Sequence, residues 1–272
     1  MEKKNKTEKV PRKFYKYGIP KKIFLKGIEN NNYLINYLFI TTHRSLSDIL
    51  TFTKKQLFEF HKVSNAQNKK QVILDMQISL KEFGRNYNDK NIDLNVYGLN
   101  DLITIELDMF ETEFCIPFGL LDNYELKILN SYDGKKVGFG KLLLVFLRHK
   151  VIMYKRSNPN EMPETIPEIS YFYKNHLAEE LHIARGTIES SIKLLEDLKL
   201  IKTTTGKFIK TYDGVIHKGE TIVADYYSNN KNSSAELELA CGVKYLERQF
   251  LEKDKERRIN KEKKFLKKNK EI

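Results

Sequence analysis

The same order of secondary-structure signals occurs twice along this chain, and the repetition restricts the folds that the chain can adopt. In each half an apolar helix precedes a short helix, a longer helix and then residues with strand character. A chain of 272 residues has room for two domains of this kind. The expected fold class is therefore α+β and mainly helical, with two similar units in tandem.

The first half opens with a helix over residues 31–45, whose apolar residues fall on one face. Thr53 is a natural N-cap and Gln56 stands three residues later, so a capping box is expected to start the short helix there. A break over residues 63–68 separates it from a longer helix at 68–83. Strand-like stretches follow at residues 91–97, 102–110 and 112–116.

The second half carries clearer signals. An apolar helix is expected over residues 139–154, and three prolines exclude a helix from the loop that follows it. A short helix at 177–181, a tight connection at 182–184 and a longer helix at 186–199 come next. Two strands are expected beyond Leu200, at residues 207–212 and 220–227, joined through the hairpin signal Asp213-Gly214.

The excess positive charge lies almost entirely at the two ends of the chain. The net charge is +12, from 48 Lys and Arg against 36 Asp and Glu. Residues 1–27 carry a net charge of +8 and residues 246–272 carry +5, which leaves −1 for residues 28–245. Such arms suit contact with a polyanion, and they equally suit solvated tails.

Residues 177–202, LAEELHIARGTIESSIKLLEDLKLIK, resemble a helix-turn-helix. Together with the basic hairpin that follows, they look like a winged-helix DNA-binding domain. In such a motif the second helix enters the major groove of duplex DNA. The side chains off its apolar stripe are the ones that we expect to reach bases or phosphates: Arg185, Thr187, Glu189, Ser190 and Lys193. An alternative role for Thr187 is capping or packing of the helix.

The hairpin after this helix is strongly basic. Between Lys199 and Lys218 five lysines stand against one aspartate, a net charge of +4. The strand tips of a wing lie along the phosphate backbone, so the lysines expected to contact phosphates are Lys202, Lys207 and Lys210. The alternative is a solvated hairpin that bears lysines.

The first half resembles a second winged helix less closely. Its short and long helices have the right order and lengths, and positive charge comes from Lys54, Lys55, Lys69, Lys70 and Arg85. No small-residue turn matches the family pattern, and the connection over residues 63–67 is looser than usual. The alternative is a diverged domain that only packs against the other half.

Tandem winged helices in one small chain look like the replication initiators of bacterial plasmids. The opening RKFYKYGIPKKIF at residues 12–24 is also similar to the start of initiators from plasmids and phages of low-GC Gram-positive bacteria. The resemblance implies four parts: a basic arm at 1–27, winged-helix domains at 28–130 and 131–233, and a C-terminal helix with a basic tail at 234–272.

The function that this resemblance implies is sequence-specific binding of double-stranded DNA, with a plasmid or mobile-element replication initiator as the first choice. A homodimer partner and host replication proteins are the further partners. Two alternatives stay open: a transcriptional repressor of a mobile element, and a scaffold whose domains bind protein rather than DNA. The second is compatible with the near-neutral charge of the body.

Motifs for catalysis or metal binding are missing from the sequence. The segment at residues 134–142, GKKVGFGKL, lacks the glycine spacing and the hydroxyl residue of a phosphate-binding loop. The six histidines form no HxH or HExxH cluster, so neither a rolling-circle nuclease nor a zinc site is expected. The expectation is a non-enzyme with no cofactor and no metal.

The expected location is the cytoplasm, in association with plasmid or nucleoid DNA. The longest apolar run, LLLVFL at residues 142–147, is too short to span a membrane. The cysteines, Cys115 and Cys241, show no pairing pattern, which fits a reducing compartment.

A further helix is expected from Ser234 onward. Its apolar stripe is formed by Leu239, Val243, Leu246 and Phe250, and either the body or a dimer contact would cover it. Beyond Leu251 apolar residues are too sparse to bury, so the last twenty residues should form a charged helix or an unstructured arm.

Overall fold

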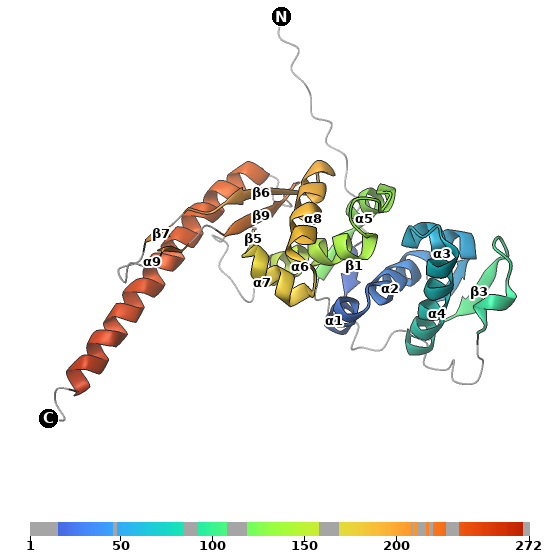
Figure 1. Cartoon of the computed structure of the whole chain (residues 1–272), viewed down its shortest axis with the longest axis horizontal. Helices are drawn as coiled ribbons and strands as arrows, with labels where there is room; N and C mark the ends of the chain where they lie inside the picture. Colours follow the sequence, from blue (N-terminus) through green and yellow to red (C-terminus); the bar gives the residue numbers. More distant parts are fainter. Residues whose placement is uncertain are drawn as a thin grey trace, which may run out of the picture.

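The computed structural model is α+β and mainly helical, as the sequence predicts (Figure 1). It describes residues 16–45, 48–83, 92–107, 119–157, 169–207, 209–210, 216–217, 220–226 and 234–268. Several expected features therefore lie outside the described residues: the opening 12–15, Arg85, the strand at 112–116, the proline-containing loop and the Asp213-Gly214 turn. Within the described part, no helix is both long enough and apolar enough to cross a bilayer.

The second half consists of a helix, a strand, two helices and two further strands. The three strands form one sheet, with the last strand in its middle. The elements are α6 (Phe139–Ser157), β5 (Ser170–Phe172), α7 (Lys174–Leu181), α8 (Arg185–Asp197), β6 (Ile201–Thr205) and β9 (Thr221–Asp225). The sheet order is β5-β9-β6, and both pairings are antiparallel. A hairpin extension, β7 (Ile209–Lys210) and β8 (Ile216–His217), lies between β6 and β9.

The first half follows the same order with a smaller sheet. Its elements are α2 (Asn31–His43), β2 (Ile49–Phe52), α3 (Lys54–His61), α4 (Ala66–Phe83), the 3₁₀ turn η2 (Leu94–Val96) and β3 (Ile103–Glu106). Strands β2 and β3 pair antiparallel. The predicted capping box is confirmed, because the Gln56 N–H donates to Thr53 Oγ1 at 3.2 Å and the Thr53 N–H donates to Gln56 Oε1 at 2.8 Å.

The prediction of a strand at residues 91–97 is wrong. Within the described part of this stretch Leu94–Val96 form η2 instead, where the Asp93 carboxylate accepts the N–H of Asn95 at 2.9 Å and so favours a turn over an extended chain. The long strand expected at residues 102–110 is limited to β3 in the described part.

Four elements that the sequence analysis did not predict join the ends of the first half. They are β1 (Lys16–Ile19), α1 (Lys21–Glu29), β4 (Gly119–Asp122) and α5 (Asn123–Ser131). Strand β1 pairs antiparallel with β4, and the Tyr37 hydroxyl donates to Gly18 O at 3.0 Å. Part of the segment expected to be a basic arm is therefore packed, with Ile23 and Phe24 buried.

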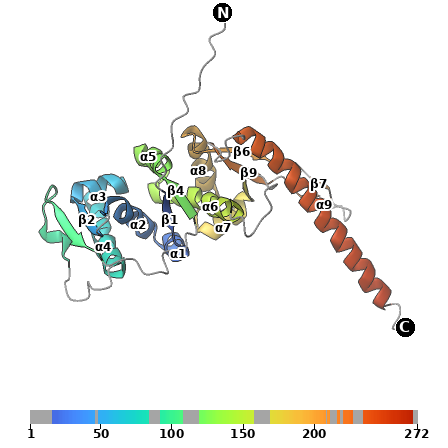
Figure 2. The same ribbon diagram turned by 180° about the vertical axis from the view of Figure 1, so that it is seen from behind.

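One continuous hydrophobic core runs through both halves, with α2 and α6 at its centre. Figure 2 shows these two helices from behind. Aromatic rings link the halves edge to face: Phe39 meets Phe60 at 5.3 Å between centroids, and Phe60 meets Phe139 at 6.2 Å. Gly140 lets α6 approach α2 closely, because a Cβ atom at this position would lie 2.6 Å from the Cβ atom of Asn31. The two halves are thus fixed to each other by packing.

The C-terminal helix α9 (Ala235–Lys268) packs on the outer face of the three-stranded sheet. Its buried residues Leu239 and Leu246 form a second hydrophobic cluster with Ile222 and Ala224 of β9. Of the two positions expected for the apolar stripe, the structure places it on the body. The helix then continues past the sheet to Lys268 (Figure 1).

The contact at Gly140 can be tested with two matched glycine variants. Gly140→Ala should lower the free energy of unfolding by about 1–2 kcal/mol, because overpacking against Asn31 outweighs the gain in helix propensity. Gly186 is also the second residue of a helix, but a Cβ atom there meets nothing within 4 Å, so Gly186→Ala should be neutral or stabilising. Urea unfolding measures both. Equal effects of the two variants would contradict the close approach of α2 and α6.

Candidate nucleic-acid interface

Helices α7 and α8 are joined by a turn of three residues that is fixed by backbone geometry. His182 adopts a left-handed conformation, with φ of 53° and ψ of 38°, and ends α7. The Ile183 N–H then donates to Ala178 O at 3.0 Å, and Ile183 itself is buried. This turn changes the chain direction abruptly, so that α8 starts at Arg185 with its inner residues on the core.

The turn between α3 and α4 repeats this geometry. Lys62 is left-handed, with φ of 58° and ψ of 37°, and the Val63 N–H donates to Phe58 O at 3.1 Å. The connection runs from Lys62 to Asn65, and the Asn65 side chain accepts the N–H of Asn68 at 2.7 Å. The sequence suggested a looser connection. The correspondence was hidden because a lysine occupies a left-handed position that glycine or asparagine usually takes.

Helix α8 is amphipathic, and its outer face is not covered by the described part of the chain. Ile188, Ile192 and Leu195 are buried, as their spacing predicts. The outward residues Arg185, Ser190 and Lys193 are exposed, while Thr187 and Glu189 are half-buried. All five predicted contact residues of α8 thus lie on the outward side or at its border.

Two of these five residues are engaged with each other. Glu189 Oε1 lies 3.2 Å from Arg185 Nε and 3.7 Å from Lys174 Nζ. Both ion pairs are at the surface, where each contributes at most about 1 kcal/mol, so a phosphate or base edge can displace them. Thr187 is not the capping residue: the N-cap is Ala184, which has no side chain able to cap the helix.

Two lysines of the basic hairpin form ion pairs with α9. Lys202 forms an ion pair with Glu236 of α9, and its Nζ lies 5.3 Å from the ring centroid of Tyr226. Lys207 Nζ lies 3.5 Å from Glu247 Oε2, with 65% of its side chain exposed. The side chain of Lys210 lies outside the described residues. Lys202 therefore faces α9, whereas Lys207 stays largely open to solvent.

The predicted basic residues of the first half that the structure describes lie near the N-terminal ends of α3 and α4. Lys55 and Lys70 are exposed, and Lys54 is half-buried. Lys69 Nζ lies 5.5 Å from the ring centroid of Phe58, a cation–π contact between the two helices. Lys62, which the sequence analysis did not single out, donates to Asn130 O and so joins the α3–α4 turn to α5.

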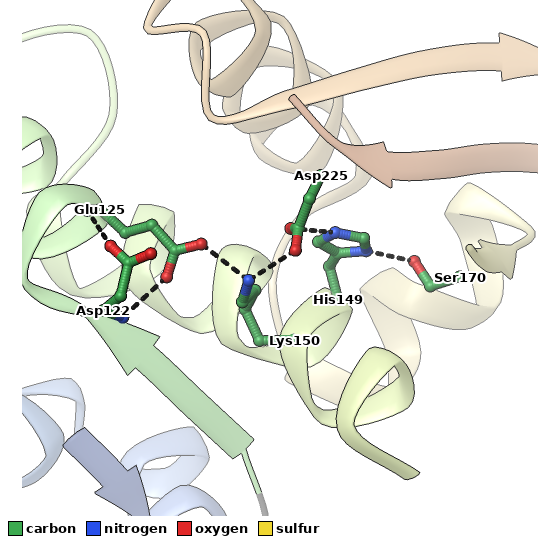
Figure 3. Close-up of polar contacts among 6 residues, drawn as sticks. All are labelled: Asp122, Glu125, His149, Lys150, Ser170 and Asp225. Atoms are coloured by element: carbon green, nitrogen blue, oxygen red, sulfur yellow. Dashed lines mark hydrogen bonds and ion pairs between the residues drawn. The ribbon is translucent and has the colours of Figure 1, made fainter. Parts of the chain in front are cut away.

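A buried chain of polar side chains lies where the sheet meets α5 and α6 (Figure 3). His149 Nε2 lies 3.0 Å from Asp225 Oδ1, and Ser170 Oγ lies 2.6 Å from His149 Nδ1. Lys150 Nζ donates to Asp225 Oδ2 and to Glu125 Oε1, each at 2.7 Å. These residues come from α5, α6, β5 and β9, so the chain of contacts ties the central helix to both strands.

The charges of this cluster compensate one another. Burial alone would lower the pKa of Lys150, but the two carboxylates outweigh burial and raise it. Burial would likewise raise the pKa of Asp225, but the charge of Lys150 and the hydrogen bond from His149 hold it below its usual range. Burial raises the pKa of Glu125 to about 7. Asp225 and Lys150 are therefore the stable ion pair, and Glu125 is the member that can accept a proton near neutral pH.

The order Ser170–His149–Asp225 is that of a hydrolase triad, yet its position points to a structural role. Asp225 is a carboxylate that only accepts, so His149 Nε2 carries a proton and donates to it, while His149 Nδ1 lies within hydrogen-bond distance of the Ser170 hydroxyl. Ser170 is 0% exposed and His149 is 3% exposed. A substrate would have no access to the hydroxyl, whereas a tether between α6 and the sheet requires this burial.

The sequence analysis missed this cluster. Its members lie far apart in the chain, and they meet only when β9 closes the sheet. One signal was present: the consecutive polar residues Arg148, His149 and Lys150 interrupt a helix that is otherwise apolar. Polar residues at buried helix positions require partners.

A second buried polar chain holds the first half together. His61 Nε2 lies 2.8 Å from Asn36 Oδ1, and Asn36 Nδ2 donates to Ser79 Oγ at 2.9 Å. The three residues join α3, α2 and α4. Burial lowers the pKa of His61 to about 3, so the ring is neutral in the folded protein at physiological pH.

Comparison with models of known protein families, with curated proteins and with solved structures found no match to this chain. Among the residues that the structure describes, no three or more His, Cys, Asp or Glu side chains are grouped so as to hold a metal ion. The candidate nucleic-acid interface therefore has no support from a related protein.

Removal of the lysine at the centre of the buried cluster tests its role. Lys150→Met leaves Asp225 and Glu125 without their cation, so the free energy of unfolding should fall by about 3–5 kcal/mol. Lys127→Met, on the exposed face of α5, makes the same chemical change and should stay within about 0.5 kcal/mol of wild type. Urea unfolding at pH 7 distinguishes them. A loss below 1 kcal/mol for Lys150→Met would show that the cluster is not structural.

His61 should make stability depend on pH. Its folded pKa of about 3 lies below the ordinary value of 6.5, so the unfolded chain binds the proton and stability is lost as the pH falls below about 6.5. His61→Gln keeps a donor for Asn36 but does not titrate. Between pH 7 and pH 4.5, wild type should lose about 2–3 kcal/mol more than His61→Gln. His182→Gln, at an exposed histidine, is the control and should follow wild type; parallel curves for all three proteins would contradict the assignment.

Proposed function

We propose that this protein binds double-stranded DNA sequence-specifically through two winged-helix domains in tandem, with α8 in a major groove. The observation that carries the proposal is the exposed outer face of α8 above a buried inner face. A recognition helix needs this division, because its inner residues hold it rigid while its outer residues meet base edges. Arg185 and Lys193 are the residues proposed to read the site.

The arrangement of elements supports the winged-helix assignment of the second half. A winged helix typically has a helix, a strand, two helices and then further strands, with the last strand in the middle of the sheet. The second half has its elements in this order. The hairpin extension β7–β8 occupies the place of the wing. Lys207, exposed at the base of this extension, and Lys210, within it, are proposed to contact phosphates.

The repeated turn supports the assignment of the first half. Two left-handed residues, Lys62 and His182, end two short helices of eight residues each, and the residue after each makes the same backbone hydrogen bond. Lys55 and Lys70 give this unit exposed positive charge. Two such units in one chain suit a site that is itself composed of repeats, because each unit can contact one copy of the repeated sequence.

The biological role that we propose is initiation of replication of a plasmid or another mobile element. The support is the tandem architecture and the resemblance of residues 12–24 to initiator proteins, of which residues 12–15 lie outside the described part. A homodimer partner and host replication proteins belong to this proposal. A transcriptional repressor would use the same surface. A direct-repeat array within or beside the gene supports an initiator, and an inverted repeat over its own promoter supports a repressor.

Two sets of variants can test whether α8 recognises bases and the hairpin contacts phosphates. Arg185→Ala and Lys193→Ala should each abolish the difference in affinity between a specific and a scrambled duplex. Lys207→Ala combined with Lys210→Ala should weaken binding to both duplexes about equally and lower the salt slope by about one to two. Gel-shift titration at several salt concentrations measures both effects. Lys127→Ala is the control and should match wild type.

The result that contradicts the proposal is equally plain. If all variants bind both duplexes as wild type does, α8 and the hairpin do not contact DNA. A scaffold that binds protein would then be the better account, and the near-neutral charge of residues 28–245 is the observation that favours it.

A further inference from the structure

One stripe of side chains along α9 changes from apolar to basic residues after Phe250. Along the docked part the stripe is apolar. Its members pack on the outer face of the sheet or lie at the edge of that contact: Ala235, Leu239, Val243, Leu246 and Phe250. The helix continues without a break to Lys268, beyond the sheet (Figure 1).

Beyond Phe250 the same stripe continues with basic residues. An α-helix returns to the same face after 18 residues, which are five turns of about 3.6 residues. A shift of the five apolar positions by this interval gives Lys253, Arg257, Lys261, Lys264 and Lys268. The first four have described side chains, and all four are exposed. These four residues are named the basic row.

One acidic residue of the same segment, Asp254, lies at the edge of the row, and the others lie off it. Asp254 is buried and accepts from Arg258 Nη2 at 2.8 Å, an ion pair between neighbours on the helix. The remaining acids, Glu252, Glu256 and Glu262, project from other sides of the helix. The exposed charge on this face is therefore basic, because Asp254 at its edge is buried.

The basic row begins close to the hairpin of the proposed interface. Lys207 of the hairpin contacts Glu247 of α9. Lys253 follows Glu247 by six residues, which is about 9 Å along the helix axis. The row faces the side on which α9 meets the sheet and extends over about 16 Å, which corresponds to about five base pairs of duplex.

We propose that the basic row is a second contact to the backbone of the same duplex, independent of sequence and flanking the site that α8 reads. The inference rests on the proposed function. A row of cations without apolar neighbours suits phosphates, because each neutralised phosphate releases counterions. A membrane surface would require apolar side chains on the same face, and the row has none. The contact lengthens the footprint of the protein without adding base specificity.

The test removes four charges from the row and, in a control, four charges from the rest of the helix. The row variant is Lys253→Gln, Arg257→Gln, Lys261→Gln and Lys264→Gln together. The control variant carries Gln at four exposed basic positions off the stripe: Lys244, Arg248, Lys255 and Lys263. Both variants have the same net charge and the same substitution chemistry. Circular dichroism and thermal unfolding establish that α9 remains folded in each.

Binding is measured with two duplexes: the shortest one that is bound selectively, and the same site with about ten base pairs of arbitrary sequence on each side. Wild type and the control variant should bind the long duplex at least about tenfold more tightly near 0.15 M salt, with a steeper salt slope. The row variant should bind both duplexes as wild type binds the short one. Its discrimination against a scrambled site should be unchanged.

Two results would overturn the inference and leave the proposed function standing. One is a row variant that keeps the full advantage of the long duplex. The other is a control variant that loses this advantage to the same extent. A row variant that loses binding to anionic phosphatidylserine vesicles, with duplex binding unchanged, would identify a membrane as the partner and also overturn it. If wild type shows no preference among duplexes, the proposed function fails, and the inference fails with it.

Discussion

The ion pair of Lys150 with Asp225 is the interaction on which the arrangement of the second half depends. Asp225 ends β9, the middle strand of the sheet, and Lys150 lies on the central helix α6. Glu125 adds α5, and His149 with Ser170 adds β5. A buried ion pair of this kind contributes little net stability compared with apolar packing, but it is satisfied in only one arrangement of its partners. It therefore fixes the orientation of the sheet on α6, and the sheet and α6 together support α8.

The sequence predicted those parts of the fold that depend on neighbouring residues. The spacing of Ile188, Ile192 and Leu195 fixed the inner face of α8, because residues three and four positions apart share one face of a helix. The capping box at Thr53 was equally local. In contrast, β1 pairs with β4 across about a hundred residues, and no pattern in either strand of four residues identifies its partner.

The same distinction applies to the candidate interface. Exposure of Arg185, Ser190 and Lys193 followed from helical periodicity and is confirmed, although their contact with DNA stays a prediction. The orientation of Lys202 did not follow, because its partner Glu236 lies 34 residues away in the chain and the two meet only when α9 packs on the sheet. The net charge of a segment states how many cations it has. Only packing decides which of them face a neighbour and which face solvent.

The proposed interface divides recognition between a rigid part and charged extensions. Helix α8 is held by the core, which suits the reading of base edges. The hairpin and the distal half of α9 carry exposed lysines, which suit contacts to phosphates. The ion pairs of Lys202 and Lys207 with α9 place these two extensions side by side, so that one duplex can meet both.

The most direct test of the central claim is a selection of duplexes from a random-sequence pool by the full-length protein, with sequencing of the bound fraction. The account predicts enrichment of one sequence motif, arranged as a direct repeat. Recovery of a bound pool with the composition of the input, or of no duplex at all, would contradict it.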